Sequence, residues 1–252
     1  MNVLLLLTLL LVLLIFLVGG KNGLYTILGL FANVLLFFLL LLLYHFRLPV
    51  LPSAVGIFLL ITCVTLFFVN GYNLKMKAAF VSVVFFLVVF LFVTPLLSEL
   101  AIQGFTRIEL DELTGFDLHV SLDFLALTRA ILLISVSGAV LDASVSIASA
   151  TYEVYLANPV QTYRELVRSS LRIGRKILAT TVTTLVFAFM GNCLALILWF
   201  IDLELSFGQL INEKTFVLEY VTVMITTSAA ILVLPITSVI SSFFFTRQEK
   251  SS

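Results

Sequence analysis

Long apolar runs dominate this sequence and restrict what it can fold into. Many reach about 17 to 25 residues, the length at which a helix crosses about 30 Å of hydrocarbon. Short polar or glycine-containing stretches separate them, and 62% of the 252 residues are apolar whereas 11% are charged. We therefore predict one integral membrane domain covering 1–252, whose fold class is an all-α polytopic helix bundle.

The apolar runs and the residues that interrupt them predict seven membrane-spanning helices. Their predicted ranges are 2–18, 24–45, 50–70, 78–97, 124–152, 177–200 and 216–243. The four spans within 1–97 are rich in Leu, Val and Phe, so we expect them to face lipid or a partner protein. The three spans within 124–246 carry polar stripes, and we expect them to form the packed core.

Basic residues near the ends of the spans predict that the N-terminus is outside and the C-terminus inside, because Lys and Arg in short loops stay in the cytoplasm. In this orientation the inner side carries Lys21, Lys75, Lys77, Arg164, Arg168, Arg172, Arg175, Lys176, Arg247 and Lys250. The outer side keeps Arg47, Arg107 and Lys214, with Arg129 just inside the membrane. The 14 basic and 14 acidic residues cancel, and we expect no nucleic-acid partner.

The segment 98–123 is predicted to be an acidic loop on the outer side. It contains Glu99, Glu109, Asp111, Glu112, Asp117 and Asp123, with Ile, Leu and Phe between them. Such a loop can form a vestibule that attracts cations, or it can be a solvated loop that lies partly on the bilayer. We favour the solvated loop.

The inner connection near 160–175 is predicted to be a short amphipathic helix after a turn at Asn158 and Pro159. Thr162 and Glu165 have the spacing of a capping box. One face of this helix is basic and consists of Arg164, Arg168, Arg172 and Arg175, and another carries Val167, Ser170, Leu171 and Gly174. The basic face can meet membrane lipid phosphates or an acidic partner, and we favour lipid.

A polar stripe runs along the predicted helix 124–152 and just past its end. Asp142, Ser146, Ser149 and Glu153 recur at i, i+4, i+7 and i+11, which places them on one side of a helix. Gly138 continues the stripe one turn earlier. Small and hydroxylated residues in a membrane helix allow close approach and supply hydrogen bonds between helices. We therefore predict a polar centre along this stripe, with close packing at Gly138.

The span 177–200 offers a matching face. Thr180, Thr184 and Gly191 are spaced for one side of that helix, with Thr181 and Thr183 beside them. We predict that Thr180 and Thr184 belong to the same polar centre and that Gly191 is a second position of close packing.

Asp142 is the residue whose presence most needs an explanation. Taking an isolated carboxylate out of water is so costly that it stays neutral or finds a partner. No basic residue occurs at comparable depth in another predicted span. Three interpretations remain: a protonated Asp hydrogen-bonded to Thr or backbone carbonyls, a carboxylate in a water-filled path, or a pairing with another protein.

Catalysis, metal binding and cofactor binding find no support in the sequence. An intramembrane aspartyl protease needs two carboxylates that share a water, and no other predicted span holds a second Asp at matching depth. Cys63 and Cys193 each stand alone in an apolar run, and His45 and His119 lack a partner at ligand spacing. We therefore expect no enzyme activity, no metal and no cofactor.

Residues 138–200 resemble the signature region of the YibE/F-like family of bacterial multi-spanning membrane proteins. The specific elements are the block G-x-x-x-D-x-x-x-S-I-x-S from Gly138 to Ser149, Glu153, the block S-x-x-x-G-R from Ser170 to Arg175, and the Thr-rich helix that follows. The resemblance implies a multi-pass protein of the bacterial plasma membrane. It also implies a split subunit without the extracytoplasmic domain, with a second YibE/F-type membrane subunit that carries this domain as its partner.

The same hairpin is similar, more weakly, to the corresponding region of SecD/SecF and the resistance-nodulation-division permeases. That similarity implies that a mid-membrane carboxylate takes part in proton-coupled conformational change. Two functions follow as hypotheses. The chain is either a permease or permease subunit in which Asp142 responds to protons or cations, or a non-transporting scaffold or assembly subunit that pairs with a second membrane protein. Homo- and hetero-oligomers are both compatible with these hypotheses.

Overall fold

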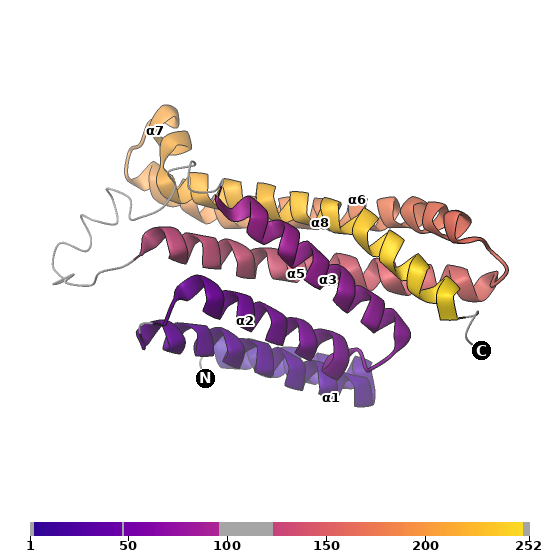
Figure 1. Cartoon of the computed structure of the whole chain (residues 1–252). Coiled ribbons are helices and arrows are strands. Elements are labelled where there is room, and N and C mark those ends of the chain that lie inside the picture. Colours follow the sequence, from indigo (N-terminus) through magenta and orange to yellow (C-terminus); the bar gives the residue numbers. More distant parts are fainter. Residues whose placement is uncertain (1–2, 47, 96–122, 249–252) are drawn as a thin grey trace.

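The computed structural model describes residues 3–46, 48–95 and 123–248, and this part of the chain is almost entirely helical (Figure 1). The elements are α1 (Val3–His45), α2 (Val50–Cys63), the π-helix η1 (Val64–Val69), α3 (Leu74–Val93), α5 (Phe124–Ala157), α6 (Tyr163–Asp202), α7 (Phe207–Asn212) and α8 (Lys214–Gln248). The acidic segment predicted to be an outer loop lies outside the described residues except for Asp123, whose carboxylate accepts a hydrogen bond from the Ala126 N–H at the start of α5.

Seven helices in the described part of the chain are long and apolar enough to cross a membrane, which confirms the predicted all-α polytopic bundle. They correspond one to one with the predicted spans. Helix α1 supplies the first two, Val3–Gly20 and Asn22–His45, and α2 and η1 together form the third. Three of them exceed by more than ten residues the roughly 20 that a bilayer requires. Helix α5 has 34 residues, α6 has 40 and α8 has 35. The basic connector is therefore the first part of α6, and the chain does not leave the helix between residue 163 and the span.

Glycines permit the tight reversal within α1. The chain turns back at Gly20, where φ is +53° and ψ is −129°, a conformation that residues with a Cβ rarely adopt. A Cβ on Gly23 would overlap the Ile15 carbonyl oxygen, so the two arms of α1 approach at the turn. A Cβ on Gly29 would overlap the Val69 side chain, so the second arm lies directly against η1.

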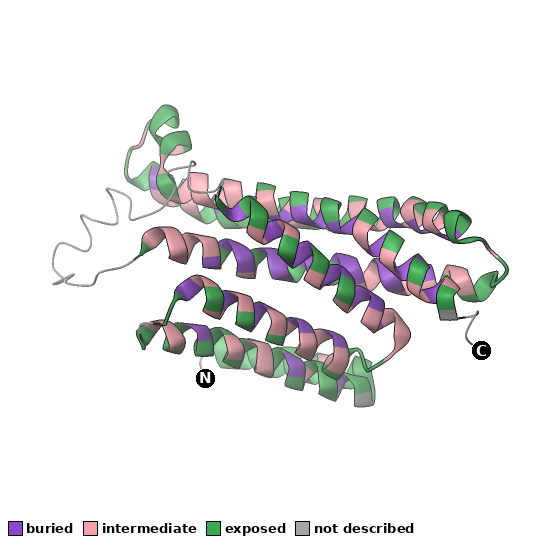
Figure 2. Ribbon diagram, viewed as in Figure 1, coloured by how far each residue is buried: buried purple, intermediate pink, exposed green. Residues whose placement is uncertain are grey.

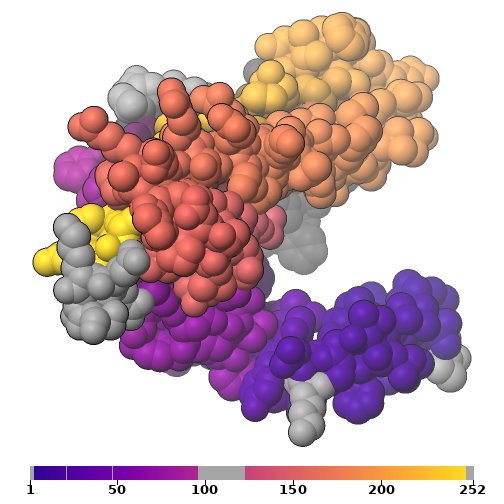
Figure 3. Space-filling view, turned by 90° about the vertical axis from the view of Figure 1, so that its right-hand side faces the viewer, coloured from indigo at the N-terminus to yellow at the C-terminus, as the bar shows by residue number. Residues whose placement is uncertain are grey.

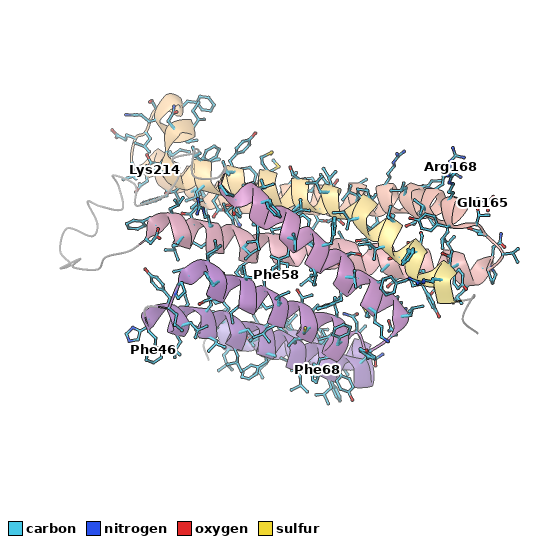
Figure 4. All side chains as sticks on the ribbon, viewed as in Figure 1. Phe46, Phe58, Phe68, Glu165, Arg168 and Lys214 are labelled. Atoms are coloured by element: carbon cyan, nitrogen blue, oxygen red, sulfur yellow. The ribbon has the colours of Figure 1, made fainter. Side chains whose placement is uncertain are left out.

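Helix α5 is the centre of the bundle. It packs against α2, α3, α6 and α8 (Figure 1). The largest fully buried side chains of the core include Phe58, Phe86, Leu132, Leu133 and Ile147, which come from α2, α3 and α5. Phe58 is labelled in Figure 4, as are Phe46 and Phe68, whose exposed fractions are 67% and 47%.

The expected division into lipid-facing and core helices is wrong for α2 and α3, and also for α6, which was expected in the core but has five buried residues among its 40. Helices α2 and α3 each bury one face against α5, and small residues such as Ala54, Ala79 and Ser82 permit close contact there. Figure 2 shows that buried residues continue along α2, α3, α5 and α8, whereas α1 is mostly exposed. The physical reason is that lipid tails are as apolar as a protein core, so Leu and Phe content cannot identify the buried face.

Helices α5, α6 and α8 meet in a tight junction. A Cβ on Gly174 of α6 would lie 3.1 Å from Leu234 of α8 and 3.7 Å from Ile147 of α5. One turn closer to the α5–α6 connection, the hydroxyls of Thr151 and Ser170 are 2.6 Å apart and buried. Thr151 also donates to the Ile147 carbonyl, so Ser170 is the donor to Thr151. This junction fixes the spacing of α5 and α6.

Seen end-on, the molecule is open on one side. Figure 3 shows a hollow between the N-terminal helices and α6. Helix α1 contacts α2 and η1, whereas α6 contacts α5 and α8. On the side of α5 between these two groups of helices, residues such as Gly138 and Asp142 are exposed.

Candidate functional site

A polar groove lies between α5 and α6, beyond the tight junction. Its volume is about 430 Å³ and it is open along one side. The lining residues are Gly138, Ala139, Asp142, Ser146, Ile177, Thr180, Thr181, Thr184 and Leu185, and we call this space the Asp142 groove. The structure thus brings together Asp142, Ser146, Thr180 and Thr184, four of the six residues predicted as one polar centre, and Gly138, which was predicted as a close-packing position, also lines the groove.

Asp142 lies near the middle of α5. At about 1.5 Å per residue it is about 27 Å from Phe124 and about 22 Å from Ala157 along the axis. Its neighbours Leu141 and Ala143 are buried in the core, whereas Asp142 is exposed on the groove side. Within the described residues its carboxylate has no hydrogen-bond or ion-pair partner. The groove therefore presents an unpaired carboxylate near the middle of a helix that is long and apolar enough to cross a membrane.

The threonines of the groove direct their hydroxyl protons to their own helix. Thr180 donates to the Ile177 carbonyl at 2.7 Å, and Thr181 donates to the same carbonyl at 3.2 Å. Thr184 donates to the Thr180 carbonyl at 3.0 Å. Such back-bonding is an ordinary way for a helix to satisfy a hydroxyl. Each of the three hydroxyl oxygens lines the groove and keeps the capacity to accept a hydrogen bond.

Helix periodicity explains why these side chains meet. The core-facing side of α5 carries Leu133, Val136, Val140 and Ile147, which are buried against α2, α3 and α8. The polar stripe lies on the opposite side and turns toward α6. The junction at Gly174 holds the two helices close near the connection. The groove lies next to this contact, where α6 presents the larger side chains of Ile177 and Leu185.

Ser149 and Glu153, also predicted for the polar centre, do not line the groove. Ser149 is half-buried at the level of the junction, between Ile147 and Thr151, and Glu153 is exposed near the end of α5. They share a side of α5 with Asp142, as the spacing predicted, but the contact between Ile147 and Gly174 at the junction separates them from the groove.

The close packing predicted at Gly138 and Gly191 is not found between described residues. A Cβ on either glycine would meet no atom within 4 Å. Gly174 is the glycine at which α6 approaches its neighbours. Sequence reasoning placed Gly174 on the less polar side of the connector and missed its packing role. A glycine that shares a face with Ser170 and Leu171 is compatible with a helix contact, but the sequence does not distinguish it from a glycine on an open face.

The predicted capping box at the start of α6 is confirmed. The Thr162 N–H and the Thr162 hydroxyl both donate to the Glu165 carboxylate at 2.9 Å. The four arginines of the basic face, Arg164, Arg168, Arg172 and Arg175, are all exposed, whereas Ser170 and Gly174 are buried. Figure 4 labels Glu165 and Arg168 at this end of α6. The basic face is therefore available to a ligand outside the bundle.

Seven helices in the described residues are apolar and long enough to cross a membrane, and a polar groove lies between two of them, which defines a polytopic α-helical membrane protein. A family comparison makes this more specific: the model of the YibE/F-like protein family matches residues 7–247. The chain therefore belongs to the YibE/F-like family. No curated protein and no solved structure matches it.

Proposed function

We propose that this protein is a subunit of a membrane permease in which Asp142 responds to protons or cations. The observation that carries the proposal is the Asp142 groove, which holds an unpaired carboxylate and four hydroxyl side chains near the middle of a membrane helix. An ionisable residue inside a membrane protein is costly, and such residues mark ion and substrate pathways. A residue with only a structural role would be expected to have a partner in its own chain.

The charge state of Asp142 biases the groove between two arrangements. A protonated Asp142 is neutral and can donate one hydrogen bond to a threonine oxygen. An ionised Asp142 is an acceptor only and favours water or a cation. A change of protonation therefore changes which contacts between α5 and α6 are favourable, which is the local event that a proton-coupled switch requires.

The rest of the assembly is part of the proposal. We place the chain in the bacterial plasma membrane with its N-terminus outside and its C-terminus inside, and we pair it with a second YibE/F-type subunit that carries an extracytoplasmic domain. The family membership and the distribution of basic residues support this arrangement. No residue of the chain is assigned a catalytic role.

Two substitutions at one position test the proposal. The wild-type gene, Asp142→Asn and Asp142→Leu are each returned to a deletion strain together with the gene of the proposed YibE/F-type partner subunit. Membrane level, copurification of the two proteins and growth under the condition that the deletion impairs are then measured. Asn retains size and hydrogen bonding but cannot ionise, so we expect normal assembly and loss of function.

A scaffold is the second candidate. The observation that favours it is that most of the outward face of α6 is exposed, with few buried residues between Gly174 and Phe200 apart from Cys193. A helix from a partner protein could cover this face and the groove together. In that case Asp142→Asn is nearly silent and Asp142→Leu impairs copurification. Full activity and normal assembly of Asp142→Leu would contradict both functions.

A further inference from the structure

We propose that the Asp142 groove binds a small organic monocation, a protonated amine with an apolar body, and that this cation competes with a proton for Asp142. This inference rests on the proposed function and names the substrate class of the same site. The hydrogen-bond donors and acceptors that line the groove, its size and its charge each point to such a ligand.

The groove is rich in acceptors and poor in donors. The hydroxyl protons of Thr180, Thr181 and Thr184 are committed to backbone carbonyls of α6. Among the lining side chains, the Ser146 hydroxyl is the one donor without such a commitment in the described part of the chain. The ionised Asp142 carboxylate adds two acceptor oxygens. A ligand that satisfies these atoms must donate hydrogen bonds, as an ammonium group does.

The size and the apolar part of the groove fit an organic body better than a bare ion. Its volume of about 430 Å³ lies within the range of small-molecule sites, roughly 300 to 1,000 Å³. Ala139, Ile177 and Leu185 form an apolar wall beside the polar atoms. Divalent metal ions use several oxygen ligands at short distance, often more than one carboxylate, whereas this groove supplies one. The single negative charge matches one positive charge.

Asp142 is the one acidic residue among those that line the groove, and the other charged residues of the described helices lie farther away. On α6, Arg175 and Lys176 are exposed at the connector end, and Lys176 lies one turn from Thr180. On α5 the next acidic residue toward the connector is Glu153, beyond the junction. Helix α2, which packs on the other side of α5, contains no charged residue. The charged residues of α3 and α8 in the described chain are Lys75, Lys77, Lys214, Glu219 and Arg247, all near helix ends.

A second copy of this chain is a poor occupant of the groove. Two facing grooves would bring two Asp142 carboxyls together, and like charges at short range repel. The described spans offer no lysine or arginine at the depth of Asp142 that a second copy could insert. A small cation supplies the missing positive charge without either difficulty.

Binding of the cation and protonation of Asp142 exclude each other. When the carboxyl is protonated, the ammonium ion enters and the O–H bond of Asp142 breaks, so one proton leaves for each cation bound. Charge is conserved in this exchange. Affinity therefore falls as the pH is lowered, because protons compete for the same oxygen atoms. The geometry thus points to exchange of a proton for an organic cation.

The test uses the full chain in lipid nanodiscs and the fluorescent monocation dansylcadaverine. N-acetyl dansylcadaverine has the same fluorophore and no ammonium charge, and empty nanodiscs correct for partition into lipid. We expect saturable binding of the cation, weaker binding of the neutral analogue by at least about tenfold, and a similar loss in Asp142→Asn. Asp202→Asn, which changes an exposed carboxylate at the far end of α6, should bind as wild type does.

Several results would overturn the inference. Equal binding of the charged and neutral probes to the wild-type chain would show that the groove is merely apolar, and this comparison holds even if Asp142→Asn does not fold. Unchanged binding to a folded Asp142→Asn protein would exclude Asp142. If dansylcadaverine does not bind while Asp142→Asn still abolishes function in cells, the assignment of an organic cation as the ligand is wrong, whereas the proposed function stands. A copurified partner helix that crosslinks to Ser146→Cys would replace the cation as occupant.

Discussion

Asp142 differs from the other carboxylates of the described chain in its position along its helix. Asp123, Glu165 and Glu219 lie at or near the start of a helix, and Glu153 lies near the end of one, where water is close. Asp142 is near the middle of α5 and faces an open groove. Its charge is therefore the one that a bilayer would make most costly, and any group that neutralises it gains the most.

Lys176 offers a test of this electrostatic argument with a single substitution. It is exposed one turn from Thr180, so its ammonium group repels a cation in the groove, and the surrounding solvent partly screens this repulsion. We predict that Lys176→Gln binds dansylcadaverine about threefold more tightly at low ionic strength, and that the difference shrinks at high salt. Titration in nanodiscs at two salt concentrations measures both effects.

A loss of affinity in Lys176→Gln would mean that Lys176 helps to hold the ligand or to position Asp142. Lys214→Gln, at the start of α8 and beyond the far end of α6, serves as the matched control and should leave the affinity unchanged.

At the scale of elements, the junction of α5, α6 and α8 decides where the groove begins. Gly174 lets Leu234 and Ile147 come close, and the hydroxyls of Thr151 and Ser170 join α5 to α6 one turn further on. Ser238 lies one turn beyond Leu234 in the same direction and is fully buried. The helices are thus held closely on the connector side of Asp142, and beyond the groove α6 contacts α8 again through Phe189, which packs against Phe216 and Tyr220.

Two glycines of α6 allow this to be tested with the same change. A leucine at Gly174 must displace Leu234, so we predict a loss of about 1 to 3 kcal/mol in stability. A leucine at Gly191 meets open space and should cost little. Thermal unfolding of the purified proteins in detergent compares them. Destabilisation at both positions would show that Gly191 also packs against something, as the sequence suggested.

The groove could be predicted from the sequence further than the packing around it. Spacing alone placed Asp142 and Ser146 opposite Thr180 and Thr184, because one helical period fixes which side chains share a face. Spacing could not show which glycine is the point of close approach. The structure places the contact at Gly174, and Gly138 and Gly191 meet open space. A glycine has the same sequence signature at a tight contact and on an open face, and the difference depends on where the neighbouring helix lies.

At the scale of the whole molecule, two arms surround one side of α5. The N-terminal arm is formed by α1 with α2 and η1, and the other arm is formed by α6 with α8 (Figure 3). The number and order of the spans could be predicted because hydrocarbon thickness sets the minimum length of an apolar run that crosses the bilayer. The inclusion of α2 and α3 in the core could not, because Leu and Phe suit both lipid and protein neighbours.

Orientation is tested with single cysteines in a chain whose Cys63 and Cys193 are replaced by alanine. Asn212→Cys lies on the predicted outer side, whereas Tyr72→Cys and Gln161→Cys lie on the predicted inner side. We expect a membrane-impermeant thiol reagent to label the first on intact cells and the other two after the cells are opened. Labelling of Gln161→Cys on intact cells would reverse the orientation and move the basic face of α6 outside.

The basic face of α6 gives a second prediction at this scale. Each basic residue near an anionic surface contributes about 1 kcal/mol, so replacing Arg164, Arg168, Arg172 and Arg175 together with Gln should lower the membrane yield or scramble the topology. Each single replacement should be mild. Quantitative immunoblots of membrane fractions compare the five variants. A single replacement as harmful as the quadruple one would indicate a specific acidic partner in place of lipid.

Infrared difference spectroscopy of the full chain in nanodiscs tests the central claim most directly, because it detects the C=O stretch of a protonated carboxyl group. The sample is first acidified until the wild-type chain shows a carboxyl band that is absent from Asp142→Asn. Dansylcadaverine is then added at the same pH. We predict that this band decreases in proportion to the cation bound. Binding of the cation with no change in the Asp142 band, or a band identical in wild type and Asp142→Asn throughout, would contradict the account.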